Sequence, residues 1–427
     1  MMVENKFTFK SHAWKTIREN KPVLVSFYVL IFLVVIALLA PLIANEKPLY
    51  VSYIGNGLFP AFSFKKQIVI NNGSEIISYE TTDWKKLKCD KIIFAPIPWS
   101  PLTTDYANAD YVAPGHEQGS KPVKFRHVLG TDKLGRDVLT GLIHGTRISL
   151  TIGILSMAIA SLIGIFLGAM AGYFGDEGIK TTRGIFWMIV IGIAAGYFYA
   201  FQTRSFVLKD ALQESTLMFL FQFIISIVIF AFVLMLFYLL GKLLSSVSFF
   251  SKKVFIKVDS IVSRTIEILI SLPILILIIS IAAIARPSLI NLMIIIGLTF
   301  WTDIARLTRA EFLKLRNIEF IEAARSLGYS KRRIIFRHAL PNGIAPALVA
   351  ISFGIASAIL AESALSFLGI GVPQDMVTWG SLLAQGRENF NAWWLVIFPG
   401  FAIFITVTVY NLIGDGLRDA LDVKLKS

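Results

Sequence analysis

The sequence predicts an all-α polytopic membrane protein with about eight transmembrane helices and a small extracytoplasmic segment that contains some β-structure. Of its 427 residues, 55% are hydrophobic and only 16% are charged, and the mean hydropathy is +0.69. Several apolar runs reach the ~20 residues that a helix needs to cross a ~30 Å hydrocarbon core. Lipid offers no hydrogen-bond partner to exposed backbone N–H and C=O groups, so each run is expected to be a helix.

Eight runs qualify as transmembrane segments. The first, residues 23–44, is too long for a signal peptide. Because Ala40-Pro41-Leu42 is also a poor cleavage site, we interpret this run as a membrane anchor. The other seven runs are residues 149–171, 184–201, 216–240, 266–284, 289–304, 345–365 and 393–413.

The basic residues predict the orientation of the chain in the membrane. The net charge is +13, which we attribute to the gathering of Lys and Arg on cytoplasmic loops rather than to nucleic-acid binding. Five basic residues precede the first span, so residues 1–22 are expected to form a cytoplasmic tail. Counting spans from there places residues 306–341, with nine Lys or Arg and three Asp or Glu, on the same side, together with the tail at 416–427.

A polar, turn-rich segment at residues 45–146 is predicted to lie outside the membrane. Within it, an Asn-Asn-Gly sequence at 71–73 separates two apolar-rich runs, 67–70 and 75–79, which is typical of a β-hairpin. The single cysteine, Cys89, also lies in this segment. With one cysteine, we expect no intrachain disulfide, no thiol redox pair and no metal cluster.

The second span has glycines at every fourth position, Gly164, Gly168 and Gly172. This spacing makes a groove on one helix face, where another backbone can approach closely. Two interpretations remain open: packing against a helix of the same chain, or contact with a second subunit.

The cytoplasmic loop is predicted to fold as two short helices joined by a tight turn. Residues 319–327 are strong helix formers, and Gly328 suits the C′ position, where the chain needs φ > 0. Ser330 can cap a second helix that runs through Arg337 and that Pro341 stops soon afterwards.

We call residues 319–341 the elbow. Its first helix carries Ala323 and Ala324, whose small side chains offer a thin face for close contact with a partner. The same pattern taken alone also fits ordinary intramolecular packing.

Four segments, taken together, resemble one known family. They read EAARSLG at 322–328 followed by HALP at 338–341, HVLGTDKLGRD at 127–137, LSFLGIGVP at 365–373, and NLIGDGLRDALD at 411–422. Their identity and order resemble the C-type permease subunit of the oligopeptide, dipeptide and nickel ABC importers. The resemblance covers about residues 22–42 and 127–426.

The resemblance implies a type I ABC-importer permease fold in a prokaryotic plasma (inner) membrane. Such a subunit pairs with a homologous permease, one or two separate ATPase subunits and an extracytoplasmic substrate-binding protein. ATP and Mg would then be bound by the partner ATPase, and the chain itself would hold no cofactor and would not be an enzyme. The residues that match the family's ATPase-coupling motif are Glu322, Ala323, Ala324, Gly328, Leu340 and Pro341.

The chain departs from typical relatives in two ways. Such relatives have six spans, whereas the third and fourth spans here form an inserted hairpin at about residues 179–257 of a membrane domain at 147–415. The outer segment is also longer than in a minimal member. The dipeptide Arg337-His338 favours the peptide branch of the family over nickel or another small solute.

Three acidic residues lie at membrane depth, where ionisable groups are functional candidates. Glu362, beside two serines, is the best candidate for the translocation pathway, while Glu267 and Asp303 lie near span ends, where capping or snorkelling is expected. The alternative to an ATP-driven importer is a secondary transporter or channel. HExxH, GxSxG and Walker A sequences do not occur in the chain, so it lacks these signatures of catalysis and nucleotide binding.

Overall fold

A computed structural model describes residues 18–53, 55–63, 67–70, 75–79, 82, 84–85, 87, 89–118, 125–285, 287–373 and 375–422. The chain divides into two compact units. We call Met1–Ala169 with Ile266–Ser427 the membrane unit, and Met170–Thr265 the hairpin unit.

The predicted helical membrane architecture is confirmed. Among the described residues, seven helices are long and apolar enough to cross a membrane, and a bent helix pair makes an eighth if it is counted as one span. The helices extend well beyond several of the predicted ends. They are α2 (Lys21–Ile43), α3 (Val138–Phe174), α4 (Arg183–Tyr197, continued by the π-helix η5, Phe198–Gln202), α6 (Thr216–Leu244), α9 (Leu289–Leu315), α13 (Ala345–Phe367) and α15 (Trp394–Asp422).

The fifth predicted span, residues 266–284, is wrong as a single straight helix. It consists of α7 (Val258–Ile270) and α8 (Ile274–Ile284), which meet at an angle of 85°. Pro273 explains the break, because proline has no N–H to donate and keeps the preceding residue out of the helical region. In addition, the Ser271 hydroxyl donates to the Ile268 carbonyl at 2.7 Å and so occupies a backbone acceptor of the last turn.

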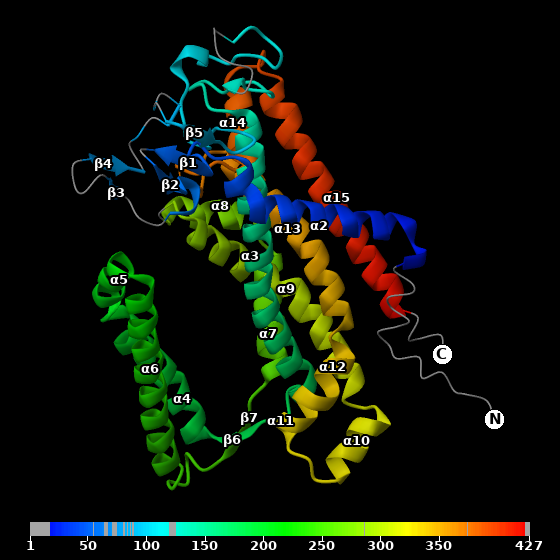
Figure 1. Cartoon of the computed structure of the whole chain (residues 1–427). Helices are drawn as coiled ribbons and strands as arrows, with labels where there is room; N and C mark the ends of the chain where they lie inside the picture. Colours follow the sequence, from blue (N-terminus) through cyan, green and yellow to red (C-terminus); the bar gives the residue numbers. More distant parts are fainter. Residues whose placement is uncertain are drawn as a thin grey trace, which may run out of the picture. The chain divides into compact units, whose positions relative to one another are not determined.

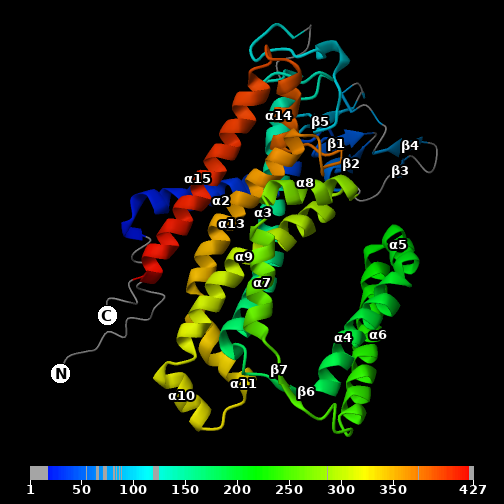
Figure 2. The ribbon, with the colours of Figure 1, turned by 180° about the vertical axis from the view of Figure 1, so that it is seen from behind.

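Close helix contacts build the membrane unit (Figures 1 and 2). A Cβ on Gly164 would lie 2.8 Å from the Trp301 carbonyl oxygen, and one on Gly168 would lie 2.5 Å from that of Ala305. These two glycines of α3 therefore face α9 of the same chain. Of the two interpretations of the glycine groove, the structure shows intramolecular packing at both positions.

The first helix, α2, packs on the last helix, α15. At one end Gly416 of α15 accommodates Val23, since a Cβ there would lie 2.5 Å from the valine side chain. Further along, Ala37 of α2 belongs to a buried cluster with Ile403 and Tyr410 of α15. The α15 helix continues through residues 416–422, which were expected to belong to the cytoplasmic tail.

The outer segment contains the expected β-structure. A three-stranded antiparallel sheet has the order β2 (Asn56–Leu58), β1 (Tyr50–Tyr53) and β5 (Lys91–Ile93). Separately, β3 (Gln67–Ile70) pairs antiparallel with β4 (Glu75–Ser78), which confirms the predicted hairpin strands, while their 71–73 turn lies outside the described residues. The described part of this segment also contains the short 3₁₀ turns η1 (Pro60–Phe62) and η3 (Tyr106–Asn108).

This outer segment has a small core of its own. Val51, Leu58, Tyr79, Trp84 and Phe94 are buried together, and Cys89 is a free cysteine packed beside them. A short helix that the sequence did not suggest, α14 (Trp379–Glu388), follows α13 and begins at a capping box formed by Thr378 and Ser381.

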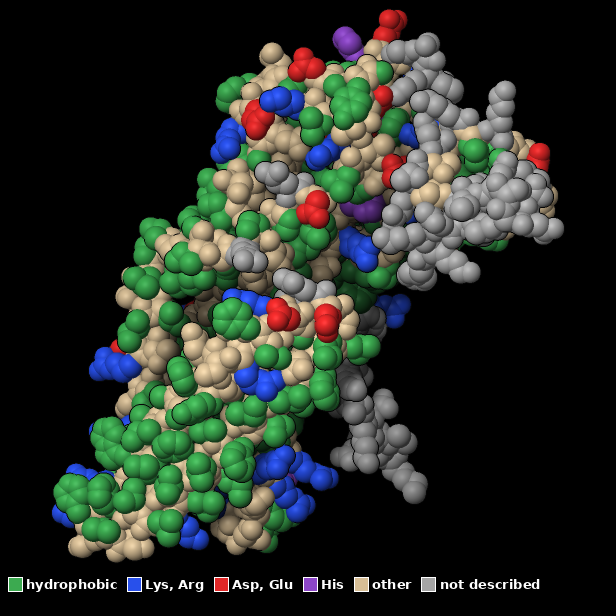
Figure 3. Space-filling model, turned by 90° about the vertical axis from the view of Figure 1, so that its left-hand side faces the viewer, with side chains coloured by type: hydrophobic (Ala, Val, Ile, Leu, Met, Phe, Trp, Pro, Cys, Tyr) green, Lys and Arg blue, Asp and Glu red, His purple; other side chains and the backbone are tan. Residues whose placement is uncertain are grey.

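The hairpin unit is two long helices joined at their base by a ribbon. The α4 and α6 helices pack through small residues: a Cβ on Gly241 would lie 2.7 Å from the Ile185 Cα atom. The short helix α5 (Ser205–Glu214) connects them. At the base, β6 (Lys180–Thr182) pairs antiparallel with β7 (Lys253–Phe255). Figure 3 shows mainly hydrophobic side chains over the helices of this unit.

Candidate coupling site and pathway

The first helix of the elbow is α10 (Glu319–Ser326). Its first turn carries Glu319 and Glu322, whose negative charges interact favourably with the partial positive charge of a helix N-terminus. Ile321 and Ala324, three residues apart on one face of the helix, are buried. The opposite face is left exposed.

The turn after α10 has the conformation that the sequence predicted. Gly328 has φ +75°. Its N–H bonds the Arg325 carbonyl at 3.0 Å, and the Tyr329 N–H bonds the Ala324 carbonyl at 3.2 Å. These two bonds form a Schellman motif, which satisfies carbonyl groups that a helix end otherwise leaves unpaired.

The second helix begins as predicted but continues further. The Ser330 hydroxyl caps α11 (Lys331–Arg333) by accepting from the Arg333 N–H. Instead of ending at Arg337, the chain continues as a π-helix, η6 (Ile334–Ala339), and then as α12 (Leu340–Gly343). The expected stop was wrong because the π-helical pattern reaches five residues back, as in the bond from the Leu340 N–H to the Ile335 carbonyl. Pro341 then lies in the first turn of α12, where a missing N–H costs little.

Two side-chain contacts, both made by Tyr329, hold the turn of the elbow against its second helix. The rings of Tyr329 and His338 stack with centroids 5.9 Å apart. The Arg333 guanidinium lies 4.3 Å from the centre of the Tyr329 ring, within cation–π distance. The elbow is thus braced internally between the turn and the second helix, and His338 is part of this bracing.

The elbow presents a mixed surface of charged and apolar groups. Glu322, Ala323, Gly328 and Pro341 are exposed, whereas Ala324 is buried and Leu340 is half-buried. The expectation that both alanines share one thin face is therefore wrong, since adjacent helix positions lie about 100° apart.

Apolar side chains also reach this surface. Leu327 is 71% exposed at the tip of the turn, and Phe336 is 56% exposed on the second helix. Beside Phe336 lies a hollow of about 430 Å³, lined otherwise by Ser330, Arg332, Arg333 and Arg337. Exposed apolar groups ringed by cations are typical of a surface that binds a protein partner.

Glu362 is buried in the middle of a cluster of hydroxyl groups. Its side chain is 0% exposed in this chain. It accepts hydrogen bonds from Ser366 at 2.8 Å, from Ser149 of α3 at 3.2 Å and from Ser363 at 3.4 Å. These contacts join α3 to α13, so they describe a structural role, and a role in the translocation pathway stays a prediction.

An apolar groove of about 790 Å³ runs along the same unit. Its apolar lining includes Phe300 of α9 with Val349 and Phe353 of α13. Asp303 and Arg306 of α9 also line it and form an ion pair of 2.8 Å. Both side chains remain more than half exposed. Because α9 and α13 lead into and out of the elbow, movement of the elbow would move the walls of this groove.

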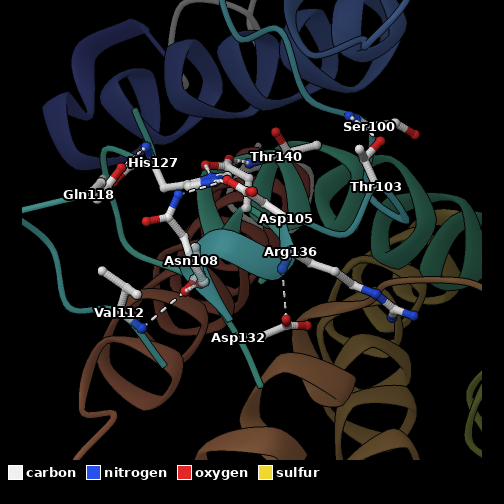
Figure 4. Close-up of polar contacts among 12 residues, drawn as sticks. Ser100, Thr103, Asp105, Asn108, Val112, Gln118, His127, Asp132, Arg136 and Thr140 are labelled. Atoms are coloured by element: carbon white, nitrogen blue, oxygen red, sulfur yellow. Dashed lines mark hydrogen bonds and ion pairs between the residues drawn. The ribbon is translucent and has the colours of Figure 1, made fainter. Parts of the chain in front are cut away.

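The motif at residues 127–137 forms a buried polar core at the N-terminal end of α3 (Figure 4). The His127 ring lies between two carboxylates, with Nδ1 2.9 Å from Asp137 and Nε2 3.2 Å from Asp105. The ring also packs on Trp99, with centroids 4.3 Å apart. Gln118 bonds both backbone groups of His127, at 2.6 and 2.8 Å. This core ties the outer segment to the start of α3, where Asp137 also accepts from the Thr140 N–H.

The turn within this motif depends on Gly135 and on the carboxylate of Asp132. The Asp132 carboxylate accepts from the Leu134 N–H at 2.9 Å and from the Arg136 N–H at 2.8 Å, the second of which Figure 4 shows. A Cβ on Gly135 would lie 2.1 Å from the Asp105 carbonyl oxygen. Burial raises the pKa of Asp132 above its ordinary value, and those backbone bonds partly oppose that increase.

Several partners of these motifs could not be read from the sequence. The indole of Trp379 donates to the Leu142 carbonyl and that of Trp394 to the Thr131 carbonyl, each at 3.0 Å. The first bond attaches Trp379 to the first turns of α3, and the second attaches Trp394 to the 127–137 motif. Asp105 likewise comes from an irregular loop far from His127 in the sequence. The only feature of the sequence that could have indicated these bonds was the presence of Trp379 and Trp394, whose indole N–H groups need an acceptor when buried.

The comparisons with known proteins agree on one family. A profile of binding-protein-dependent transport system inner membrane components matches residues 245–427, and a profile of the N-terminal transmembrane domain of oligopeptide transport permease C matches residues 8–58. The dipeptide transport system permease protein DppC of Alkalihalophilus pseudofirmus is 32% identical over 330 residues, which cover 77% of this chain and 81% of that protein.

Two further relatives extend this picture. The di/tripeptide transport system permease protein DppC of Pseudomonas aeruginosa is 32% identical over 71% of this chain and 74% of its own length. The inner membrane ABC transporter permease protein YejE of Escherichia coli is 28% identical, but the similarity covers 96% of this chain and 95% of that protein. The similarity to YejE therefore includes both the long outer segment and the hairpin unit.

Proposed function

Because the chain belongs to the C-type permease subunits of the peptide ABC importers, we propose that it forms half of a peptide pathway and couples to a separate ATPase through its elbow. The exposed, internally braced surface of α10 and the following turn is the observation that carries this proposal. The chain itself is a transport permease and not an enzyme. ATP and Mg would be bound by the partner ATPase.

The partners follow from the same assignment. A homologous permease would complete the pathway, one or two ATPase subunits would bind the elbow, and a substrate-binding protein would deliver peptide at the outer segment. The N-terminus and the elbow would lie in the cytoplasm, as the gathering of basic residues favours. The names of the relatives support di- and tripeptides as the substrate class.

Rigidity explains how the elbow would transmit motion. The helix α10 packs on η6 within the elbow, and the elbow continues through α12 directly into α13. A partner that grips the exposed face and then moves would therefore tilt α9 and α13. ATP binding would favour one conformation only to the extent that the ATPase binds that conformation more tightly.

The groove between α9 and α13 is our candidate for this chain's share of the pathway. Its volume of about 790 Å³ lies within the range of small-ligand sites. Apolar walls suit varied peptide side chains, and the Asp303–Arg306 pair offers one charge of each sign to peptide termini. Tilting of its two walls would change its width.

Reversing one charge on the elbow tests the proposal. In Glu322→Arg, the exposed carboxylate of α10 becomes a cation, which would meet the ATPase surface with the wrong sign and weaken the N-terminus of the helix. We expect ATP-dependent uptake of labelled dipeptides to fall at least tenfold and the ATPase to be lost on co-purification. The matched control is Glu117→Arg, an exposed acidic residue of the outer segment.

The outcomes separate the two function classes. Loss of uptake and of the ATPase, with normal membrane insertion, supports coupling through the elbow. Unchanged uptake contradicts it. Uptake that needs an ion gradient and no ATP would contradict the importer mechanism and favour a secondary transporter.

A further inference from the structure

Six cations gather at the base of the hairpin unit. Five of them are exposed, and Arg183 is half-buried. Three acidic residues lie in the same stretch: Asp176, Glu177 and Asp259. The Asp176 carboxylate accepts hydrogen bonds from the N–H and the hydroxyl of Ser260. We call the cationic set the basic ribbon; it consists of Lys180, Arg183, Lys242, Lys252, Lys253 and Lys257.

The basic ribbon is a built structure and not a loose loop. Strands β6 and β7 pair over three residues, with Lys180 opposite Phe255. The Arg183 N–H bonds the Lys252 carbonyl at 3.0 Å, and the Thr182 hydroxyl bonds Ser245 at the end of α6. The cations are consequently held on one short frame where both legs of the hairpin meet.

Aromatic and apolar side chains lie directly beside these cations. Lys180 is 5.1 Å from the centre of the Phe255 ring, and Arg183 is 5.5 Å from that of Phe249. Phe249 is 62% exposed, and Trp187, one turn into α4, is 55% exposed. Aromatic side chains next to cations at the end of a transmembrane helix are typical of the membrane–water interface.

Further along both helices the exposed surface is apolar. The helices α4 and α6 are candidate membrane spans, and α6 is almost unburied within the chain. The end of α4 at the basic ribbon is its N-terminus, which adds partial positive charge at the same place. Lipid tails would contact the helices, so phosphate groups would lie at the level of the cations.

We infer that the basic ribbon binds the headgroups of anionic phospholipids. Four to eight Lys or Arg next to a transmembrane helix are attracted to anionic lipid, and this chain supplies six on a fixed frame. A lipid surface fits better than an acidic protein, because the exposed aromatic side chains among the cations match an interface depth. The inference rests on the membrane-spanning fold and not on the proposed coupling role.

Brominated lipids provide the test, since bromine quenches nearby tryptophan fluorescence. The intact protein is placed in bilayers with increasing brominated phosphatidylglycerol or brominated phosphatidylcholine. The signal of Trp187 is taken as the difference from the same experiment on Trp187→Phe. We expect phosphatidylglycerol to occupy the sites beside Trp187 with about fivefold preference over phosphatidylcholine. A preference of about fivefold is the effect of about one net cation near a lipid surface.

Charge neutralisation and salt make the result decisive. The preference for phosphatidylglycerol over phosphatidylcholine should fall to about 1:1 in a neutralised variant that carries Lys180→Gln, Lys252→Gln, Lys253→Gln and Lys257→Gln. The control variant loses the same number of positive charges from the outer segment and should keep the lipid preference. It carries Lys47→Gln, Lys91→Gln, Arg126→Gln and Lys133→Gln. In the unmodified protein, raising the ionic strength should lower the preference without any substitution, because exposed charges are screened.

Three results would overturn the inference. The first is equal quenching by the two lipids in the unmodified protein. The second is an unchanged preference in the neutralised variant or at high salt. The third is an ATPase or other soluble protein that is lost from the neutralised variant while the lipid preference persists, which would assign the basic ribbon to a protein partner. None of these depends on whether the elbow couples to an ATPase.

Discussion

Gly328 combines a demanding backbone conformation with free space around it. Its φ is +75°, and nothing lies within 4 Å of the place where a Cβ would stand. Any effect of a substitution there must therefore come from the backbone. In an L-residue other than Gly, Asn or Asp, the left-handed conformation costs about 1–2 kcal/mol.

We predict that Gly328→Ala weakens binding of the ATPase to the elbow, while Gly328→Asn largely preserves it. Alanine opposes the left-handed turn, and asparagine tolerates it. The cost of about 1–2 kcal/mol corresponds to about 5–30-fold in affinity. Titration of purified ATPase against each variant in detergent measures this, and equal affinities for both variants would contradict it.

Asp132 serves as a backbone acceptor inside a buried turn. Its ordinary pKa is 3.8, and burial raises it in the folded protein. Below the ordinary value the carboxyl is neutral in both states, so its burial costs little. As the pH rises through the raised pKa, the buried carboxylate ionises and the folded state loses stability relative to the unfolded state.

We predict that Asp132→Asn gains stability relative to the unmodified protein as the pH rises from below 4 towards 7. The amide oxygen can still accept from Leu134 and Arg136, and it carries no charge to desolvate. Asp132→Ala leaves those N–H groups without their acceptor and should cost about 1–3 kcal/mol. Thermal unfolding in detergent across this pH range measures both. A constant difference between Asp132→Asn and the unmodified protein would contradict the pH argument.

At the scale of helices, the contact between α3 and α9 depends on backbone approach. A Cβ on Gly168 would lie 2.5 Å from the Ala305 carbonyl oxygen, and the backbone of α9 cannot move aside like a side chain. Gly400 of α15 instead has open space around it. The two glycines provide the same substitution in opposite surroundings.

We predict that Gly168→Leu destabilises the membrane unit by about 1–3 kcal/mol or more, as overpacking does. Gly400→Leu should leave the unfolding temperature within about 2 °C, a small change for a domain of this size. Thermal unfolding of the purified protein compares them. Equal stability of the two variants would show that α3 and α9 do not pack as described.

The sequence predicted the long helices well because their length and apolar composition are dictated by the membrane. It failed where a few residues decide the local path. Pro273 broke the fifth span at 85°, although a proline within a transmembrane run is often accommodated by a mild kink. The π-helix at Ile334–Ala339 had no signal in residue type, since it differs from an α-helix only in that its hydrogen bonds reach five residues back instead of four.

The site was predictable in its local parts and not in its long-range ones. Gly328 predicted the turn and Ser330 predicted the helix cap, because both residues act on backbone groups only a few positions away. The different burial of Ala323 and Ala324 depends on which face of α10 packs against the rest of the chain, which sequence spacing alone does not fix. The burial of Glu362 against Ser149 depends on how α3 packs on α13.

At the scale of the whole molecule, the base of the hairpin unit indicates that this unit entered the chain as a single insertion. The segment leaves and re-enters at one point: Lys180 lies opposite Phe255, and the Ile256 N–H bonds the Ile179 carbonyl at 3.0 Å. An insertion with adjoining ends can be excised without stretching the remainder. Replacing residues 183–252 by Asn-Gly would turn β6 and β7 into an ordinary two-residue hairpin.

We predict that this shortened chain inserts into the membrane and still retains the ATPase. Failure to insert, measured by membrane fractionation, would show that the two added helices are needed to fold the rest. Success would mark them as a cassette grafted onto a six-span ancestor, acquired in one step and removable in one.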